Sequence, residues 1–96
     1  MQQTYLQEYY GLECPICEVM RARLDKLEKD LGVQIERFEV WHNQENMDKA
    51  EALEKNGLVK VAGIPFFYNT QTGGSLCGEV SYEKLKAWAL GKPKTL

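Results

Sequence analysis

Strand-like and helix-like segments alternate along this chain, and their order limits the folds that it can adopt. Segments with the aromatic, β-branched or alternating apolar residues of strands cover residues 4–10, 33–41, 64–68 and 75–77. Segments with apolar residues at steps of three and four, as in amphipathic helices, cover residues 15–31, 47–55 and 82–90. The predicted order of elements is therefore βαβαββα.

This order indicates how the strands pair. The two strand–helix crossovers imply a parallel pair of strands. A short turn at residues 70–74 joins the last two strands, which favours an antiparallel hairpin. The second strand is apolar on both faces, so both faces of the sheet should be covered. We therefore predict an α/β fold in which a four-stranded mixed sheet carries helices on both faces.

Length and composition fit a single domain that spans residues 1–96. The chain is 44% apolar and 27% charged, as is typical of a soluble globular protein. Its net charge is −2 and its acidic and basic residues are interleaved, so we expect no nucleic-acid partner. No apolar run approaches the roughly 20 residues that span a bilayer, so we expect no membrane association.

The N-terminal residues and the cysteine count both favour a reducing compartment. Residues 1–5 have neither the basic start nor the apolar stretch of a secretory signal peptide. Three cysteines, an odd number, argue against a secreted disulfide scaffold. We therefore expect a cytoplasmic protein, and we expect it to act as a monomer.

Two cysteines open the first helical segment in the motif Cys14-Pro15-Ile16-Cys17. Unpaired N–H groups and the positive dipole end at a helix N-terminus stabilise a thiolate on the first cysteine. The second cysteine lies one turn further on, where it can attack a mixed disulfide formed by the first. Pro15 suits the first helical position, which needs no amide donor.

Cys17 also begins the apolar stripe of this helix, which places it toward the core. The stripe then runs through Met20, Leu24, Leu27 and Leu31 before Gly32 ends the helix. Cys14 lies off this stripe, so we expect its thiol to be exposed at the surface. An exposed attacking thiol and a sheltered resolving thiol form the pair that disulfide exchange requires.

The element order, the Cys-Pro-x-Cys motif after the first strand and the proline that opens the third strand resemble the thioredoxin-like superfamily. The motif looks like the glutaredoxin Cys-Pro-Tyr-Cys, whereas Val61-Ala62-Gly63-Ile64-Pro65 is similar to the thioredoxin stretch that ends in Gly-Ile-Pro. The resemblance covers nearly the whole chain. It implies a cis Ile64–Pro65 peptide bond beside the dithiol, with the backbone of Ile64 pairing with an extended substrate.

The resemblance implies a thiol–disulfide oxidoreductase that reduces or exchanges protein disulfides. Cys14 would attack, Cys17 would resolve, and no cofactor beyond their own redox-active disulfide would be needed. The substrate-binding residues implied by the family pattern are Pro15, Ile16, Ile64, Pro65 and Gly78.

Glu8 lies six residues before Cys14, where thioredoxins keep a buried Asp and protein disulfide isomerases a Glu. Strand parity places it with core residues, so burial should raise its pKa and allow it to accept the Cys17 proton. Arg37 falls near this acid in the family pattern, and we predict a Glu8–Arg37 pair. The alternative is that Glu8 is an ordinary exposed residue of an edge strand.

Two departures from the family pattern bear on the substrate. Glu13 replaces the tryptophan that precedes the thioredoxin motif, and Glu18 follows Cys17, so both negative charges oppose a thiolate at Cys14. The lysine with which glutaredoxins hold the glutathione carboxylate has no counterpart. We therefore expect protein disulfide substrates, with electrons from a reductase or another dithiol protein.

Other interpretations of the cysteines remain open at this level. The dithiol could form a Cys₃His zinc site with Cys77 and His42, or share an iron–sulfur cluster between two subunits. Alternatively, the dithiol is vestigial and the chain is a binding adaptor that docks a partner on a Trp41/Ile64/Gly78 surface. In the simplest interpretation, Trp41 is a core residue, His42 a solvated loop residue and Cys77 a small apolar strand residue.

Overall fold

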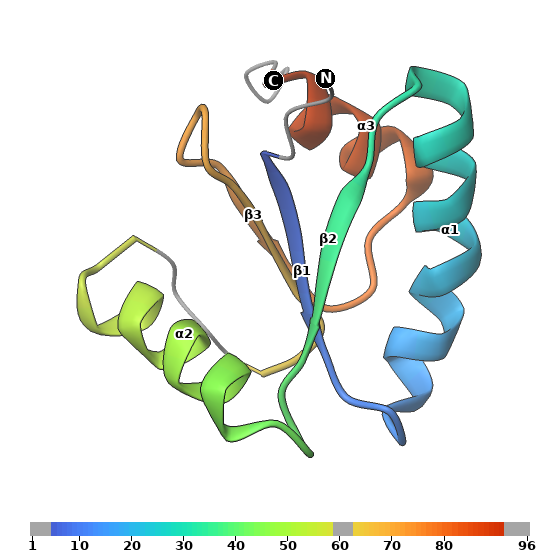
Figure 1. Cartoon of the computed structure of the whole chain (residues 1–96). Coiled ribbons are helices and arrows are strands. Elements are labelled where there is room, and N and C mark those ends of the chain that lie inside the picture. The colour runs from blue at the N-terminus through green and yellow to red at the C-terminus, as the bar shows by residue number, and fades with distance from the viewer. Residues whose placement is uncertain (1–4, 59–62, 92–96) are drawn as a thin grey trace.

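The computed structural model describes residues 5–58 and 63–91 (Figure 1). The elements follow the predicted order: β1 (Leu6–Tyr10), α1 (Pro15–Leu31), β2 (Ile35–Glu39), α2 (Gln44–Lys55), β3 (Phe66–Asn69), β4 (Ser75–Cys77) and α3 (Tyr82–Leu90). Thr4, Val61 and Ala62, which the sequence analysis assigned to the first strand and to the Gly-Ile-Pro stretch, lie outside the described residues. No described helix is long and apolar enough to cross a membrane.

The four strands form one mixed sheet in the order β2-β1-β3-β4. Strand β1 is parallel to β2, whereas β3 is antiparallel to both of its neighbours, β1 and β4. The predicted fold class is therefore confirmed. Because β1 lies between β2 and β3, its residues are enclosed by strands on both sides.

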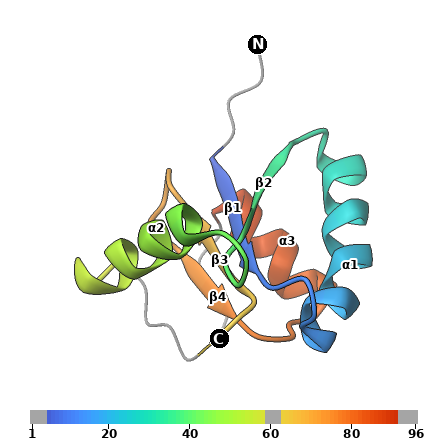
Figure 2. The same cartoon turned by 60° about the horizontal axis from the view of Figure 1, so that its bottom comes forward.

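Helices cover both faces of the sheet, as Figures 1 and 2 show. Helices α1 and α3 lie on one face, where the larger core cluster consists of Leu6, Met20, Leu24, Leu27, Ile35, Phe67, Leu85, Trp88 and Ala89. Helix α2 lies on the other face, where the smaller cluster consists of Tyr9, Val40, Ala50, Phe66 and Tyr68. Both faces of the sheet are thus covered, as predicted, although β2, the strand from which this was inferred, lies at the edge and buries only Ile35.

Helix α1 positions the dithiol, and its ends follow the sequence signals. Cys14 is its N-cap, Pro15 takes the first helical position, and Gly32 closes the helix with φ 64° while its N–H donates to Glu28 O. Leu24 and Leu27 have no exposed surface. Each fully buried leucine contributes roughly 2 kcal/mol, so packing against the sheet fixes the helix in place.

Helix α2 ends at Lys55, as predicted, but begins three residues earlier than predicted. It begins at Gln44 with Asn43 as its N-cap, because Asn43 Oδ1 accepts a hydrogen bond from Asn46 N at 3.0 Å. Asn46 donates its side-chain amide to Glu39 O at 3.0 Å. Leu58 follows the end of the helix at Lys55 and is 48% exposed. The apolar spacing begins only at Met47, so it misses the first turn, which Asn43 caps.

Candidate active site

The start of α1 brings the two motif cysteines together. Cys14 Sγ accepts a hydrogen bond from Cys17 N at 3.2 Å, the capping bond that an N-cap side chain makes with the third helical residue. The loop before it is held by Cys14 N, which donates to Gly11 O at 3.1 Å. Both thiols are free in this structure. The sulfur of Cys14 therefore lies where the helix N–H groups and dipole favour negative charge.

The predicted contrast in exposure between the two cysteines is wrong. Cys14 is 6% exposed and Cys17 is 5% exposed, so neither thiol projects from the surface. They differ instead in the hollow that each lines. Cys14 lines a groove of about 450 Å³ on the α2 side of the sheet, whereas Cys17 lines a cavity of about 190 Å³ together with Glu8.

Trp41 forms one wall of the groove beside Cys14. A Cβ built on Gly11 would lie 2.4 Å from the Trp41 ring and 2.8 Å from Ile64 Cδ1, so ring, glycine and isoleucine are in close contact. Trp41 is 49% exposed, and its assignment to the core was wrong. The residue follows β2 in a loop, where it packs over the glycine with one side and leaves the other side to the groove.

The predicted substrate-binding residues lie around this groove in different ways. Ile64 lines it, and the Ile64–Pro65 peptide bond is cis. Pro65 is fully buried behind it and accepts a 2.7 Å hydrogen bond from Gly78 N through its carbonyl oxygen. Pro15 and Ile16 are exposed on the first turn of α1. The structure thus ties Gly78 to Pro65 and places Ile64 in the groove with Cys14.

Glu8 is buried in the central strand β1, with 3% of its surface exposed. It lines the smaller cavity with Tyr10, Cys17, Arg21 and Arg37. Burial raises the pKa of Glu8 to about 7, although the positive charges of Arg37 and Arg21 oppose the shift. The alternative, an exposed residue on an edge strand, does not hold.

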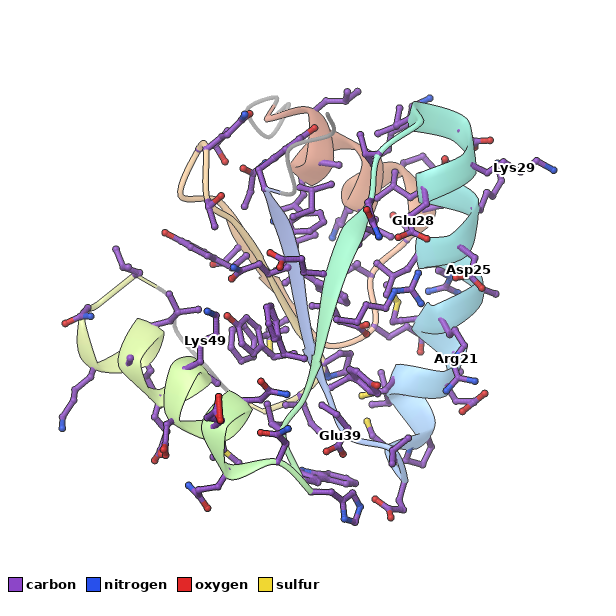
Figure 3. All side chains as sticks on the ribbon, viewed as in Figure 1. Arg21, Asp25, Glu28, Lys29, Glu39 and Lys49 are labelled. Carbon is purple, nitrogen blue, oxygen red and sulfur yellow. The ribbon has the colours of Figure 1, made fainter. Side chains whose placement is uncertain are left out.

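The predicted Glu8–Arg37 ion pair is not formed. Arg37 faces Glu8 across the β1–β2 register, but its Nη2 pairs with Asp25 Oδ1 at 2.8 Å and with Glu28 Oε1 at 3.2 Å. Both carboxylates belong to α1, which lies over this edge of the sheet (Figure 3). They engage the guanidinium from the helix side and leave Glu8 only the longer-range attraction of Arg37 within the cavity.

Cys17 is held as a neutral thiol. Burial raises the pKa of Cys17 to about 12, and the hydrogen bond to Cys14 and the negative charges of Cys14 and Glu8 add to the shift, which a backbone hydrogen bond from Gly11 opposes. A thiol of this kind reacts only when a base takes its proton. Glu8 lines the same cavity as Cys17.

A clasp between the two loops beside the groove was missed by the sequence analysis. Glu39 accepts hydrogen bonds from Leu12 N at 2.9 Å and from His42 N at 2.7 Å, and His42 Nε2 lies 2.7 Å from Glu13 Oε2. Figure 3 shows Glu39 at the end of β2, next to both loops. We call Glu13, Glu39 and His42 the loop clasp. No sequence signal links residue 13 with residue 42, because only the parallel pairing of β1 with β2 brings them together.

The clasp shifts the pKa values of Glu39 and His42 and pairs an acidic residue that lies close to Cys14. Desolvation acts upward on Glu39, but the backbone hydrogen bonds from Leu12 and His42 outweigh it and lower the pKa of Glu39. The hydrogen bond to Glu13 raises the pKa of His42. Glu13 is therefore paired with His42, and Glu18 is paired with Arg21 at 3.0 Å. Both carboxylates that were expected to oppose a Cys14 thiolate are therefore paired with a basic side chain.

The residues proposed for a zinc site are not brought together. Within residues 5–58 and 63–91, the loop clasp is the only group of three or more potential ligands close enough to hold a metal ion. Cys77 is exposed on β4, where its Sγ contacts Gly63 O at 3.4 Å. His42 is engaged by Glu13. The Cys₃His set of the alternative hypothesis is therefore not assembled.

The sheet order, the helices on both faces and the Cys-x-x-Cys pair at the start of α1 together define a thioredoxin-like domain. Comparison with solved structures gives the same fold. A mitochondrial thioredoxin of Saccharomyces cerevisiae, thioredoxin 3 in its oxidised form, matches with a TM-score of 0.66 and 23% identity over 88% of this chain and 76% of that one. A glutaredoxin of Archaeoglobus fulgidus matches with a TM-score of 0.60 and 19% identity over 90% of this chain and 86% of that one.

Comparisons by sequence add nothing to this likeness. No protein-family model matches the chain, and no curated protein matches it. The chain has the thioredoxin-like fold, with Cys14 and Cys17 close together at the start of α1.

Proposed function

We propose that this protein is a thiol–disulfide oxidoreductase that reduces or exchanges protein disulfides with the Cys14–Cys17 dithiol. The observation that carries the proposal is the hydrogen bond from Cys17 N to Cys14 Sγ at the N-terminus of α1, next to a groove large enough for a substrate segment. A helix N-terminus stabilises the thiolate that attacks, and the groove gives a disulfide access to it.

In the first step, the Cys14 thiolate attacks one sulfur of the substrate disulfide. The substrate S–S bond breaks, a mixed disulfide forms with Cys14, and the other substrate sulfur leaves as a thiolate. Trp41 and Ile64 flank the attacking sulfur in the groove. The Ile64 backbone would hold the extended substrate, while Pro65 and Gly78 support that backbone from behind.

In the second step, Cys17 attacks the Cys14 sulfur of the mixed disulfide. The Cys14–Cys17 disulfide forms, the substrate leaves reduced, and the two electrons have passed from the dithiol to the substrate. The Cys17 proton has to be removed for this attack. The cavity shared with Glu8 is polar and has room for a water molecule. Such a water would relay the Cys17 proton to the Glu8 carboxylate.

Placing the proton acceptor in this cavity keeps the buried charge constant. Glu8 is ionised before the transfer and neutral after it, while Cys17 changes in the opposite direction, so the cavity holds one negative charge throughout. Arg37 and Arg21, which line the same cavity, stabilise that charge when it is on Glu8. A second buried negative charge would be strongly disfavoured.

The oxidised dithiol would be reduced again by a reductase or by another dithiol protein, without a bound cofactor. Such a cycle suits a reducing compartment such as the cytoplasm, and the groove of a single chain is sufficient for it. A binding adaptor that uses the Trp41/Ile64 surface is the competing function, because Trp41 is half exposed there.

Cysteine variants and a redox titration test the proposal. Cys14→Ser should abolish reduction of a protein disulfide such as insulin, and Cys17→Ser should accumulate mixed disulfides that dithiothreitol releases. The purified protein should show a reversible two-electron couple. A dithiol that is inert to both oxidants and reductants would support the binding-adaptor function and exclude the oxidoreductase function. Cys77→Ser is the matched control and should retain activity.

A further inference from the structure

The groove beside Cys14 combines an apolar floor with two carboxylates. Val40, Ala50 and Phe66 form buried parts of its lining, and Glu51 and Glu54 enter it from α2. None of the described residues that line the groove is a lysine or an arginine. A substrate segment lying against Cys14 therefore meets apolar surface and negative charge together.

The acidic character continues along α2 away from the dithiol. Asp48, Glu51 and Glu54 follow one another at steps of three, so they share a helix face. They line a second hollow of about 500 Å³, where Lys55 is the single cation among the described residues. Glu51 and Glu54 belong to both hollows, so the negative surface is continuous from the groove beside Cys14.

The groove carboxylates differ from the other acids near the dithiol in having no described partner. Glu13 pairs with His42 and Glu18 with Arg21, whereas neither Glu51 nor Glu54 forms an ion pair with any described residue. Both are exposed on α2. Their charge is therefore left for a molecule that enters the groove.

We propose that the groove selects protein disulfides in which the attacked cysteine is flanked by an apolar residue and a lysine or arginine. This inference rests on the proposed function and names its substrate class. The apolar side chain would contact Trp41 and Ile64, and the cation would lie near Glu51 and Glu54. Oxidised glutathione, whose carboxylates give it net negative charge, would be repelled.

Two disulfide probes that differ only in one charged residue test the selection. Each is a short peptide with a single cysteine and an adjacent leucine, with lysine in one and glutamate in the other, activated as its mixed disulfide with thionitrobenzoate. Cys14 attacks the peptide sulfur, the probe S–S bond breaks, and the coloured thiolate leaves, so stopped-flow absorbance gives the second-order rate constant. The leaving group is identical in both probes, so only the peptide charge differs.

The lysine probe should react roughly five- to tenfold faster at low salt, from two exposed charge contacts each worth a few-fold, and the two rates should converge near 1 M salt. Glu51→Gln/Glu54→Gln should bring the ratio close to one, and Glu51→Lys/Glu54→Lys should invert it. Glu45→Gln/Glu83→Gln removes the same total charge from residues that do not line the groove, and it should keep the wild-type ratio.

The outcomes separate this inference from the proposed function. Equal rates for the two probes in the wild-type protein would overturn the selection but leave disulfide chemistry in place. A lysine preference that survives Glu51→Gln/Glu54→Gln would overturn the assignment to these carboxylates. If the protein releases the thiolate from either probe no faster than a free low-molecular-weight thiol does, the proposed oxidoreductase function is instead contradicted.

Discussion

Substitution of Glu8 by glutamine gives the sharpest test of the buried acid, because the change keeps the shape and removes the titration. In the folded protein the pKa of Glu8 is raised to about 7 from its ordinary value of 4.5, with burial as the main cause. Between these two values the folded chain binds more protons at Glu8 than the unfolded chain does. The free energy of unfolding therefore falls as the pH rises through this window.

The size of this effect follows from the two pKa values. A tenfold change in proton affinity corresponds to about 1.4 kcal/mol, so a rise from 4.5 to about 7 corresponds to about 3 kcal/mol. Near pH 4.5 Glu8 is neutral in the folded state, so its burial lowers the free energy of unfolding only slightly. Near pH 8 it is ionised among buried residues, and Glu8→Gln should be more stable than the wild type by up to this amount, relative to their difference at pH 4.5.

Urea unfolding of both proteins between pH 4.5 and 8.5, with the dithiol kept reduced, measures the difference directly. The pKa of His42 is raised by its hydrogen bond to Glu13, but His42 is present in both proteins and its contribution cancels in the difference. Glu83→Gln, at an exposed position on α3, is the control and should give a difference that does not depend on pH. A flat difference for Glu8→Gln would refute the raised pKa and, with it, the case for Glu8 as proton acceptor.

Two further predictions concern the loops around the groove. Gly11→Ala should lower the free energy of unfolding by about 1–3 kcal/mol in urea unfolding, because the new methyl overlaps the Trp41 ring; an equal loss in a Trp41→Ala background would show that the ring is not the cause. Glu39→Gln should speed amide hydrogen exchange at Leu12 or His42, because a side-chain amide offers one acceptor oxygen where the carboxylate offers two; unchanged exchange at both amides would contradict the clasp.

Local patterns were enough to predict the fold and the central part of the site. Helix periodicity and capping residues gave α1 and its end at Gly32, and they placed Cys14 and Cys17 at its start. Strand parity gave the burial of Glu8, because side chains in a strand alternate between faces whatever lies around them. These inferences need only neighbours along the chain, and the structure supports each of them.

The sequence-based predictions were wrong where a side chain has several possible partners on different helices and strands. Arg37 had three carboxylates within reach of one sheet face, and the order of strands and helices alone does not say that Asp25 and Glu28 engage it before Glu8 does. Trp41 is large and apolar, but its position in a loop over Gly11 leaves half of it exposed. Tertiary packing decides such cases, and no periodicity encodes it.

The two sulfurs lie one helical turn apart, yet the end of β1 places them against opposite faces of the sheet. Cys14 adjoins the groove on the α2 face, where unpaired carboxylates meet the substrate, and Cys17 adjoins the cavity under α1, where two arginines surround a buried acid. Substrate choice and proton removal therefore depend on different residues, with the sheet between them. It follows that replacing the groove carboxylates should change rates between substrates without moving the titration of Glu8, and that the two sets of substitutions should combine additively.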